Sequence, residues 1–271
     1  MILNLHLAKA VEIEKLIAKR QRSQNQMETL MKMLIAPVQL VVVAAAFILV
    51  TNSTAQDTIK SRKPDADGFI LLFAEDGAPR GWTVRAWNDV KDPPAEPTQW
   101  SIVNGILQGG EPRGSWLMSE AEYADFILEF EFKLGERGNS GCALRAPMRG
   151  DPAFDGLELQ MADLRYNMDA KDSELTGGLY RAIAPTRQLY KPTQWNKYRI
   201  TLKGSSMKVV LNGETIQDLN LDEHNEVVKR HDGKTAPPIK ERPRKGHIGF
   251  QELSRGEGHA QIRHARIKIL E

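Results

Sequence analysis

Cysteine is almost absent from this chain, which rules out a disulfide framework. Cys142 is the one cysteine among 271 residues, so no intramolecular disulfide can form. Strand alternation around it turns its side chain to an apolar face. We therefore expect Cys142 to be a small core residue and not a nucleophile.

An excess of charge of one sign and the common nucleotide motifs are also missing. The net charge is only +2, which argues against a nucleic-acid-binding protein. The sequence contains no G-x-G-x-x-G, no G-x-x-x-x-G-K-[ST], no H-E-x-x-H and no G-x-S-x-G. We therefore expect no organic cofactor and no nucleophile of the α/β-hydrolase type.

Apolar runs long enough to span a membrane are lacking as well. The apolar run at 38–50 is shorter than the ~20 residues that a transmembrane helix needs. A lysine precedes it and the small residues 53–55 follow. This pattern predicts a signal peptide cleaved after Ala55, with the true start near Met31. An uncleaved anchor, which would be the chain's only membrane contact, is the alternative.

Export combined with a single cysteine favours the bacterial periplasm or cell envelope. We divide the chain into an N-terminal extension with the signal peptide (1–55), a linker (56–66) and a single domain (67–271).

Short alternating strands fill the domain. Residues 126–134 place apolar side chains at every second position, as in a strand with one buried face. Asn104-Gly105, Gly204-Ser205 and Asn212-Gly213 lie between apolar segments and predict hairpin turns. No sustained helical period appears after residue 56. The sequence therefore predicts an all-β fold, a β-sandwich.

Polar side chains recur on one side of two of these strands. Arg145 alternates with Cys142 and Leu144, and Glu158 and Gln160 alternate with leucine and methionine. If the two strands pair, one sheet face carries a cation, a carboxylate and an amide. The face is either a site for a polar ligand or an ordinary solvated surface.

A long irregular segment follows at 222–246, rich in charge and holding His224 and His231. It is either a lid beside the polar sheet face or a solvated excursion. Among the scattered histidines, only His247 is considered adjacent to a site, because it shares strand parity with Gln251.

Eight short motifs, in order, resemble the 3-keto-disaccharide hydrolase family, known as domain of unknown function 1080. They are G-F-I-L-L-F at 68–73 with Gly81-Trp82, W-S-I-V-N-G-I-L at 100–107, Y-A-D-F-I-L-E-F-E-F at 123–132, G-N-S-G-C-A-L-R at 138–145, E-L-Q-M-A-D at 158–163, T-G-G-L-Y at 176–180, K-P-T-Q-W-N at 191–196 and G-H-I-G-F-Q at 246–251. The resemblance implies a concanavalin-like jelly roll, an exported bacterial protein and cleavage of 3-keto-glycosides. Three positions depart from the family pattern: Glu252-Leu253 stands in place of Asp-His, and Gln194 in place of Glu.

The resemblance also implies a mechanism of elimination followed by hydration. A ketone at C3 acidifies the C2 hydrogen, the C1 oxygen leaves, and water adds back. This needs a base, an electrophile at the enolate oxygen and a proton donor.

The roles implied fall on residues of the quoted motifs. Glu158 is the candidate base or metal-ligating carboxylate, the metal being a possible divalent ion, and Asp163 is a second carboxylate. Arg145 or Lys191 would hold the enolate oxygen, and Tyr180 would protonate the leaving group or stack on the sugar. The candidates for binding the sugar substrate are Asn139, Gln160, Gln251 and His247.

Structural alternatives stand beside these roles. For Asn139, the alternative to sugar binding is that the residue only shapes a turn. For Glu158 and Arg145, the alternative is that the two side chains form a cross-strand ion pair. A non-catalytic carbohydrate-binding jelly roll is the competing function, because fold alone does not decide function.

Overall fold

The computed structural model describes residues 20–21, 26–27, 62–256 and 258–270. The chain divides into two units, Met1–Thr54 and Ala55–Glu271. The predicted signal peptide, its cleavage site after Ala55 and the start near Met31 lie outside the described residues. Within the described part, no helix is both long and apolar enough to cross a membrane.

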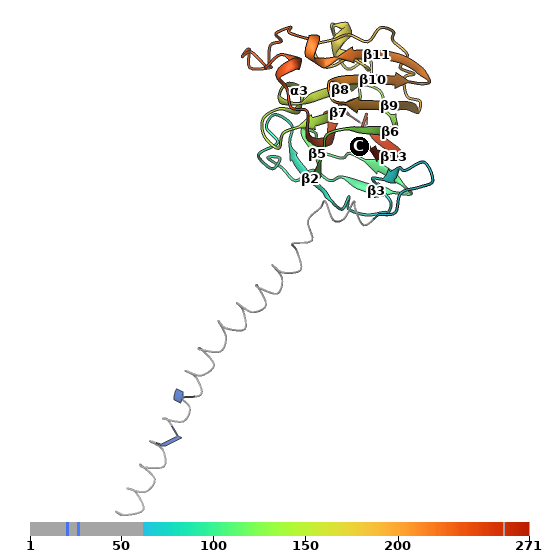
Figure 1. The fold of residues 1–271 in the computed structure, drawn as a ribbon. Helices are drawn as coiled ribbons and strands as arrows, with labels where there is room; N and C mark the ends of the chain where they lie inside the picture. The colour runs from blue at the N-terminus through green and yellow to red at the C-terminus, as the bar shows by residue number, and fades with distance from the viewer. Residues whose placement is uncertain (1–19, 22–25, 28–61, 257, 271) are drawn as a thin grey trace, which may run out of the picture. The chain divides into compact units, whose positions relative to one another are not determined.

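The second unit is a jelly-roll β-sandwich of two antiparallel sheets, which confirms the predicted all-β fold (Figure 1). The larger sheet has eight strands in the order β11-β10-β9-β6-β13-β4-β3, with β1 also paired to β13. The smaller sheet has five strands in the order β2-β5-β12-β7-β8.

The larger sheet consists of β1 (Ile70–Leu71), β3 (Ser101–Val103), β4 (Ile106–Gln108), β6 (Phe126–Lys133), β9 (Asn196–Lys203), β10 (Ser206–Leu211), β11 (Glu214–Asn220) and β13 (Gln261–Ile269). The smaller sheet consists of β2 (Trp82–Ala86), β5 (Ser115–Tyr123), β7 (Asn139–Ala146), β8 (Leu157–Ala162) and β12 (Gly246–Glu252). The short helical elements are α3 (Pro152–Asp155) and the 3-10 turns η1 (Asp172–Glu174), η2 (Leu221–Glu223) and η3 (Ile239–Glu241).

The predicted hairpin turns are confirmed. Val103 pairs with Ile106 across Asn104-Gly105, and both turn residues have positive φ, 52° and 72°. Asn and Gly adopt this left-handed conformation at low cost, and the turn it makes matches the twist of paired strands. Lys203 pairs with Ser206, and Leu211 with Glu214, across the other two turns.

One core lies between the sheets. The inward faces of β6, β7 and β8 contribute apolar side chains from alternate positions, including Phe130, Cys142 and Leu159. Cys142 is fully buried there, as its strand parity predicts. Burial of apolar surface at roughly 25 cal/mol per Å² supplies most of the free energy that holds the sheets together.

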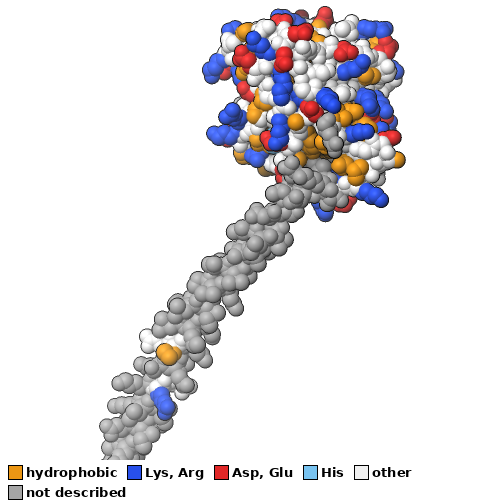
Figure 2. All heavy atoms as spheres, in the orientation of Figure 1, with side chains coloured by type: hydrophobic (Ala, Val, Ile, Leu, Met, Phe, Trp, Pro, Cys, Tyr) orange, Lys and Arg blue, Asp and Glu red, His pale blue; other side chains and the backbone are white. Residues whose placement is uncertain are grey.

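The outer face of the smaller sheet is covered, not solvated. All six residues of β8 are buried, although Glu158 and Gln160 point away from the core. The cover includes α3 and the segment after η2. By contrast, basic and acidic side chains are interspersed over the face of the domain shown in Figure 2, in keeping with a net charge of +2.

Candidate active site

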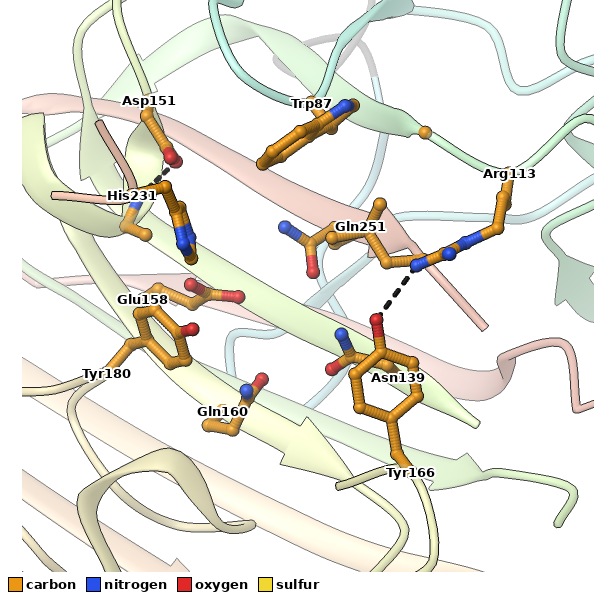
Figure 3. A pocket seen from close by; sticks show the side chains of 13 residues that line it. Trp87, Arg113, Asn139, Asp151, Glu158, Gln160, Tyr166, Tyr180, His231 and Gln251 are labelled. Carbon is orange, nitrogen blue, oxygen red and sulfur yellow. Dashed lines mark hydrogen bonds between the residues drawn. The ribbon is translucent and has the colours of Figure 1, made fainter. Parts of the chain in front are cut away.

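A cavity of about 380 Å³ lies on the outer face of the smaller sheet. Figure 3 shows polar and aromatic side chains turned toward it from strands and from loops. The residues that line it are Trp87, Arg113, Gly114, Asn139, Asp151, Ala153, Glu158, Gln160, Tyr166, Tyr180, His231, Gln251 and Leu253. A small cavity with a few convergent polar groups is the usual form of a ligand site.

Glu158 forms part of the cavity floor from near the start of β8. Its strand pairs with β7 so that Ala143 lies opposite, and the carboxyl group extends over Gly141. A Cβ on Gly141 would come within 2.0 Å of Glu158 Oε1, so only glycine leaves room for this carboxyl. The solvated-face alternative is therefore wrong, because the carboxyl is enclosed between strands and loops.

Burial is the main cause that raises the pKa of Glu158 well above its ordinary value, and the charge of Asp151 adds to it. No side chain or backbone N–H of the described residues donates a hydrogen bond that would offset this cost. Both causes favour the protonated, uncharged form of the carboxyl group.

Asp151 is the second carboxyl group of the cavity and caps α3. Its side chain accepts a hydrogen bond from the backbone N–H of Ala153 at 3.0 Å. Burial raises the pKa of Asp151 to about 7, against the hydrogen bond from Ala153, and the charge of Asp155 adds to the rise. Two carboxyl groups in one cavity with raised pKa values are typical of acid–base sites.

Tyr180 is placed beside Glu158 by an extra stretch of backbone pairing. The segment 177–180 runs along β8, where the N–H of Tyr180 donates to the carbonyl of Glu158 at 3.0 Å. Burial, followed by the negative charge of Glu158, raises the pKa of Tyr180 above its usual range. The phenol thus stays protonated and can donate a hydrogen bond into the cavity.

His231 comes from the irregular segment at 222–246, so the lid hypothesis has structural support over the solvated excursion. The guanidinium of Arg230 binds both carboxylate oxygens of Asp155, at 2.5 and 2.8 Å, and ties this segment to α3. The imidazole packs at ring-centroid distances of 5.3 Å from Phe154 and 5.8 Å from Trp87. His231 is exposed as a whole residue, but partial desolvation of its ring and the charge of Arg181 lower its pKa, which favours the neutral imidazole.

Three amide side chains, Asn139, Gln160 and Gln251, line the same cavity from β7, β8 and β12 (Figure 3). Asn139 Oδ1 is buried without a hydrogen-bond partner. A buried polar atom of this kind is costly unless a ligand or water satisfies it. The amides therefore form a ready binding surface for hydroxyl groups.

An arginine and a tyrosine close one end of the cavity. Arg113 donates a hydrogen bond to the Tyr166 hydroxyl at 2.8 Å. Arg255 packs on the same tyrosine ring, 4.5 Å from its centroid. The hydrogen bond between Arg113 and Tyr166 links the loop before β5 to the loop after β8 at this end of the site (Figure 3).

The structure brings together five of the residues predicted from the sequence: Glu158, Tyr180, Asn139, Gln160 and Gln251. Asp163 lines a smaller adjoining cavity that shares Asn139, Gln160 and Tyr180 with the main one. Its carboxylate is held by Arg165 at 2.7 Å. Burial opposes ionisation of Asp163, but hydrogen bonds from Arg165 outweigh it and lower its pKa. Asp163 is thus an ionised partner of Arg165 at the edge of the site.

The prediction that Arg145 shares a face with Glu158 is wrong. The register of β7 against β12 shifts by one residue near Arg145, whose φ is +50°. This bulge breaks the alternation and turns the guanidinium away from the cavity. Arg145 instead donates to the carbonyls of Ala124 and Gly204 and pairs with Asp125 at 2.9 Å, so the alternative of an ion pair with Glu158 is wrong too.

Lys191 and His247 also lie outside the cavity. Lys191 is exposed in the turn before β9, where its backbone N–H donates to Asn196 Oδ1. His247 Nδ1 lies 2.7 Å from the carbonyl oxygen of Ser119. Because the strand register shifts between His247 and Gly249, the side chains of His247 and Gln251 do not point to the same face of the sheet.

Sequence reasoning missed Trp87, Arg113, Asp151, Tyr166 and His231 as cavity residues. All five lie outside the named strands, where no periodicity reports the direction of a side chain. The available signal for His231 was its place in a long charged segment between strands.

The two departures from the family pattern after Gln251 have different environments. Glu252 is fully buried, and its carboxylate accepts hydrogen bonds from the backbone N–H groups of Ser254 and Ala260. Leu253 instead lines the cavity. The apolar side chain therefore stands at the site, where the family pattern has a histidine.

The donor set around Glu158 does not fit a metal centre built from side chains alone. Among the described residues, no group of three or more histidine, cysteine or acidic side chains could hold a metal ion. The divalent ion stays a prediction.

Comparison with known proteins agrees with the family resemblance of the sequence motifs. A family model for the 3-keto-alpha-glucoside-1,2-lyase-like domain matches residues 68–268. A 3-keto-disaccharide hydrolase of Bacteroides thetaiotaomicron is 28% identical over 182 residues, or 58% of this chain. The match spans only 60% of that relative's length.

Solved structures share the fold. Crystal structures of two proposed glycosyl hydrolases from Parabacteroides distasonis have TM-scores of 0.60 and 0.58, with 24% and 22% identity. They match 74% and 76% of this chain and 99% and 96% of their own. Because the family model covers nearly all of the β-sandwich, the chain belongs to the 3-keto-alpha-glucoside-1,2-lyase-like family.

Proposed function

We propose that this chain cleaves 3-keto-glycosides by elimination followed by hydration in the cavity around Glu158. The observation that carries the proposal is the buried carboxyl group of Glu158, which lines a cavity together with three amide side chains and the Tyr180 phenol. Burial of a carboxyl group without a hydrogen-bond partner destabilises the fold, and an ordinary solvated sheet face does not contain such a group. Family membership and the similarity to a 3-keto-disaccharide hydrolase support a sugar substrate.

The chemistry starts at the carbon next to the ketone. Loss of the C2 proton leaves an enolate at C2, C3 and the C3 oxygen. The enolate electrons then form a C1–C2 double bond and restore the C3 ketone, while the C1–oxygen bond breaks and the leaving oxygen takes a proton. Addition of water, with hydroxide to C1 and a proton to C2, completes a net hydrolysis without the oxocarbenium ion of ordinary glycosidases.

The protonated Glu158 is suited to deliver the proton to the leaving oxygen. We assign it the role of acid, in place of the base expected from the sequence, because burial raises its pKa and favours the protonated form. Tyr180 lies beside it and donates a hydrogen bond to charge that develops on oxygen.

The amide side chains bind and orient the sugar. Asn139 Oδ1 accepts from a sugar hydroxyl and so gains the partner that it lacks. Because Arg145 and Lys191 face elsewhere, the donors available for the enolate oxygen include the amide N–H groups, the Tyr180 hydroxyl and the Arg113 guanidinium of the cavity. Donors that are preorganised in this way stabilise an oxyanion.

Incubation of the purified chain with a 3-keto-disaccharide and with its unoxidised parent tests the proposal. We expect release of the 3-keto-sugar from the first only. Glu158→Gln should lower the rate by roughly 10²–10⁴-fold, while Glu122→Gln, at an exposed position of β5, should leave it unchanged. Tight binding without turnover, even with added divalent metal, would instead favour a non-catalytic carbohydrate-binding module.

Export to the periplasm or cell envelope is part of the proposal. It rests on the apolar segment 38–50 and the small residues at 53–55. N-terminal sequencing of the mature protein should begin at Gln56. An N-terminus before residue 38 would contradict cleavage.

A further inference from the structure

We propose that His231 is the base that removes the C2 proton, working at the same end of the cavity as Glu158, which is the acid. This inference rests on the proposed function and assigns the catalytic base within it. The sequence motifs contain no candidate at this position, because His231 enters the site from the segment between β11 and β12.

The geometry of the cavity carries the assignment. His231 and Glu158 line the same end of the cavity together with Tyr180, while Asn139 and Gln251 lie toward the other end (Figure 3). No hydrogen bond joins the imidazole to any described residue. Its ring nitrogens are thus free for a substrate, whereas those of His247 and His259 lie near protein oxygens.

The imidazole is held in position from several sides. Its edge packs on Phe154 and Trp87, and its ring lies 5.8 Å from that of Tyr180. The backbone of its turn is closed by the N–H of Arg230 donating to the carbonyl of Lys234 at 2.8 Å. Two further contacts, from Arg230 to Asp155 and from Arg181 to the Lys229 carbonyl, tie this turn to the rest of the site.

The surroundings of His231 favour its neutral form. Although the residue is exposed, partial desolvation of the ring is the main cause of its lowered pKa and the positive charge of Arg181 adds to it, against Glu174 and Asp232. A neutral imidazole can accept a proton at the pH where the Glu158 carboxyl can still donate one. The titratable or charged groups that face the ring or share its cavity are Arg113, Asp151, Glu158, Tyr166, Glu174, Tyr180, Arg181, Arg230 and Asp232.

The proton balance closes over one turnover. In the elimination, His231 takes the proton from C2 and becomes imidazolium, and Glu158 gives its proton to the leaving oxygen and becomes carboxylate. In the hydration, the oxygen of water bonds to C1 while the Glu158 carboxylate takes a proton from that water. The imidazolium of His231 returns a proton to C2. Both groups then regain their starting states without any co-reactant other than water.

Substitution of His231 tests the assignment with the 3-keto-disaccharide as substrate. His231→Gln should lower kcat by about 10²–10⁴-fold with a much smaller change in KM. The limb of the kcat/KM profile that falls toward low pH should also disappear. His224→Gln is the matched control, since His224 lies in the same segment but pairs with Glu226 and does not line the cavity; its rate should be unchanged.

Chemical rescue separates a proton-transfer role from a structural one. Added imidazole should raise the rate of His231→Ala by at least tenfold and leave Glu158→Gln unaffected. A kcat of His231→Gln within threefold of wild type, or a His231→Ala rate that imidazole does not change, would overturn the assignment while leaving the proposed function standing. Failure of the wild-type chain to cleave the 3-keto-disaccharide would instead overturn the proposed function itself.

Discussion

The Glu158 carboxyl group is buried at a cost in folding free energy. Its carboxyl group lies in a space that exists only because residue 141 has no Cβ, and it has no hydrogen-bond donor from the described part of the chain. Transfer of a carboxylate into such surroundings is strongly unfavourable, which favours the protonated form. Burial of this carboxyl group destabilises the folded state, and a role in proton transfer explains why the site contains it.

Gly141→Ala should displace the carboxyl without changing a catalytic residue. The new methyl group would lie 2.0 Å from the present position of Glu158 Oε1, so the side chain must move. A displacement of about 1 Å can lower a rate by about 10²-fold. We expect kcat to fall by roughly that factor in steady-state assays.

The same substitution in the Glu158→Gln background tests whether the effect passes through the carboxyl group. There, Gly141→Ala should cause little further loss, because the displaced acid is already absent. An equal loss in both backgrounds would show that Gly141 acts through something else.

Asp151 gives a prediction about stability and pH. Its pKa is about 7 in the folded protein, against an ordinary value of 3.8. Between these values the folded state keeps a proton that the unfolded state has lost, so the stability of the wild type falls as pH rises through this window. Each pH unit in the window costs at most about 1.4 kcal/mol.

Asp151→Asn removes this titration and keeps the cap, because asparagine accepts the same hydrogen bond from Ala153. Urea unfolding should therefore show the variant gaining stability relative to wild type from about pH 4 to about pH 7. A difference in unfolding free energy that does not change with pH would contradict the raised pKa.

At the scale of strands, alternation predicts side-chain direction only as far as the first bulge. Glu158 and Gln160 lie on an uninterrupted strand, and their predicted face is correct. Arg145 and His247 lie at register shifts between β7, β12 and β5, and both predicted directions fail. A bulge adds a residue to one strand and reverses the parity beyond it. Nothing in the residue types near Arg145 announces that change.

Arg145→Met tests the corrected place of this residue. Its fully buried guanidinium ties the end of β7 to the turns at Ala124 and Gly204 and to Asp125. Loss of these contacts leaves two carbonyls and a carboxylate without their donor, and we expect a loss of roughly 3 kcal/mol in unfolding free energy.

Chemical denaturation measures this change, and Arg80→Met is its control, since Arg80 and Glu75 form an exposed pair at 3.5 Å. That control should change stability by less than about 1 kcal/mol. The specific activity of folded Arg145→Met should stay near wild type. A catalytic loss without destabilisation would return Arg145 to the site.

At the scale of the whole molecule, the sandwich supplies a rigid floor and the loops supply the reactive walls. The floor was predictable, since hairpin turns and alternation report local structure, and the order of short motifs identified the family. The walls were not, because Trp87, Asp151 and His231 reach the cavity from segments far apart in sequence. Their convergence depends on long-range contacts such as the ion pair of Arg230 with Asp155, which no local pattern encodes.

The central claim is that this cavity removes a proton from sugar carbon C2 before the glycosidic bond breaks. Single-turnover cleavage of a 3-keto-disaccharide carrying either hydrogen or deuterium at C2 tests that claim most directly. The account predicts severalfold slower cleavage of the deuterated sugar by the wild-type chain. Equal rates for the two sugars, with the bond still cleaved, would contradict it.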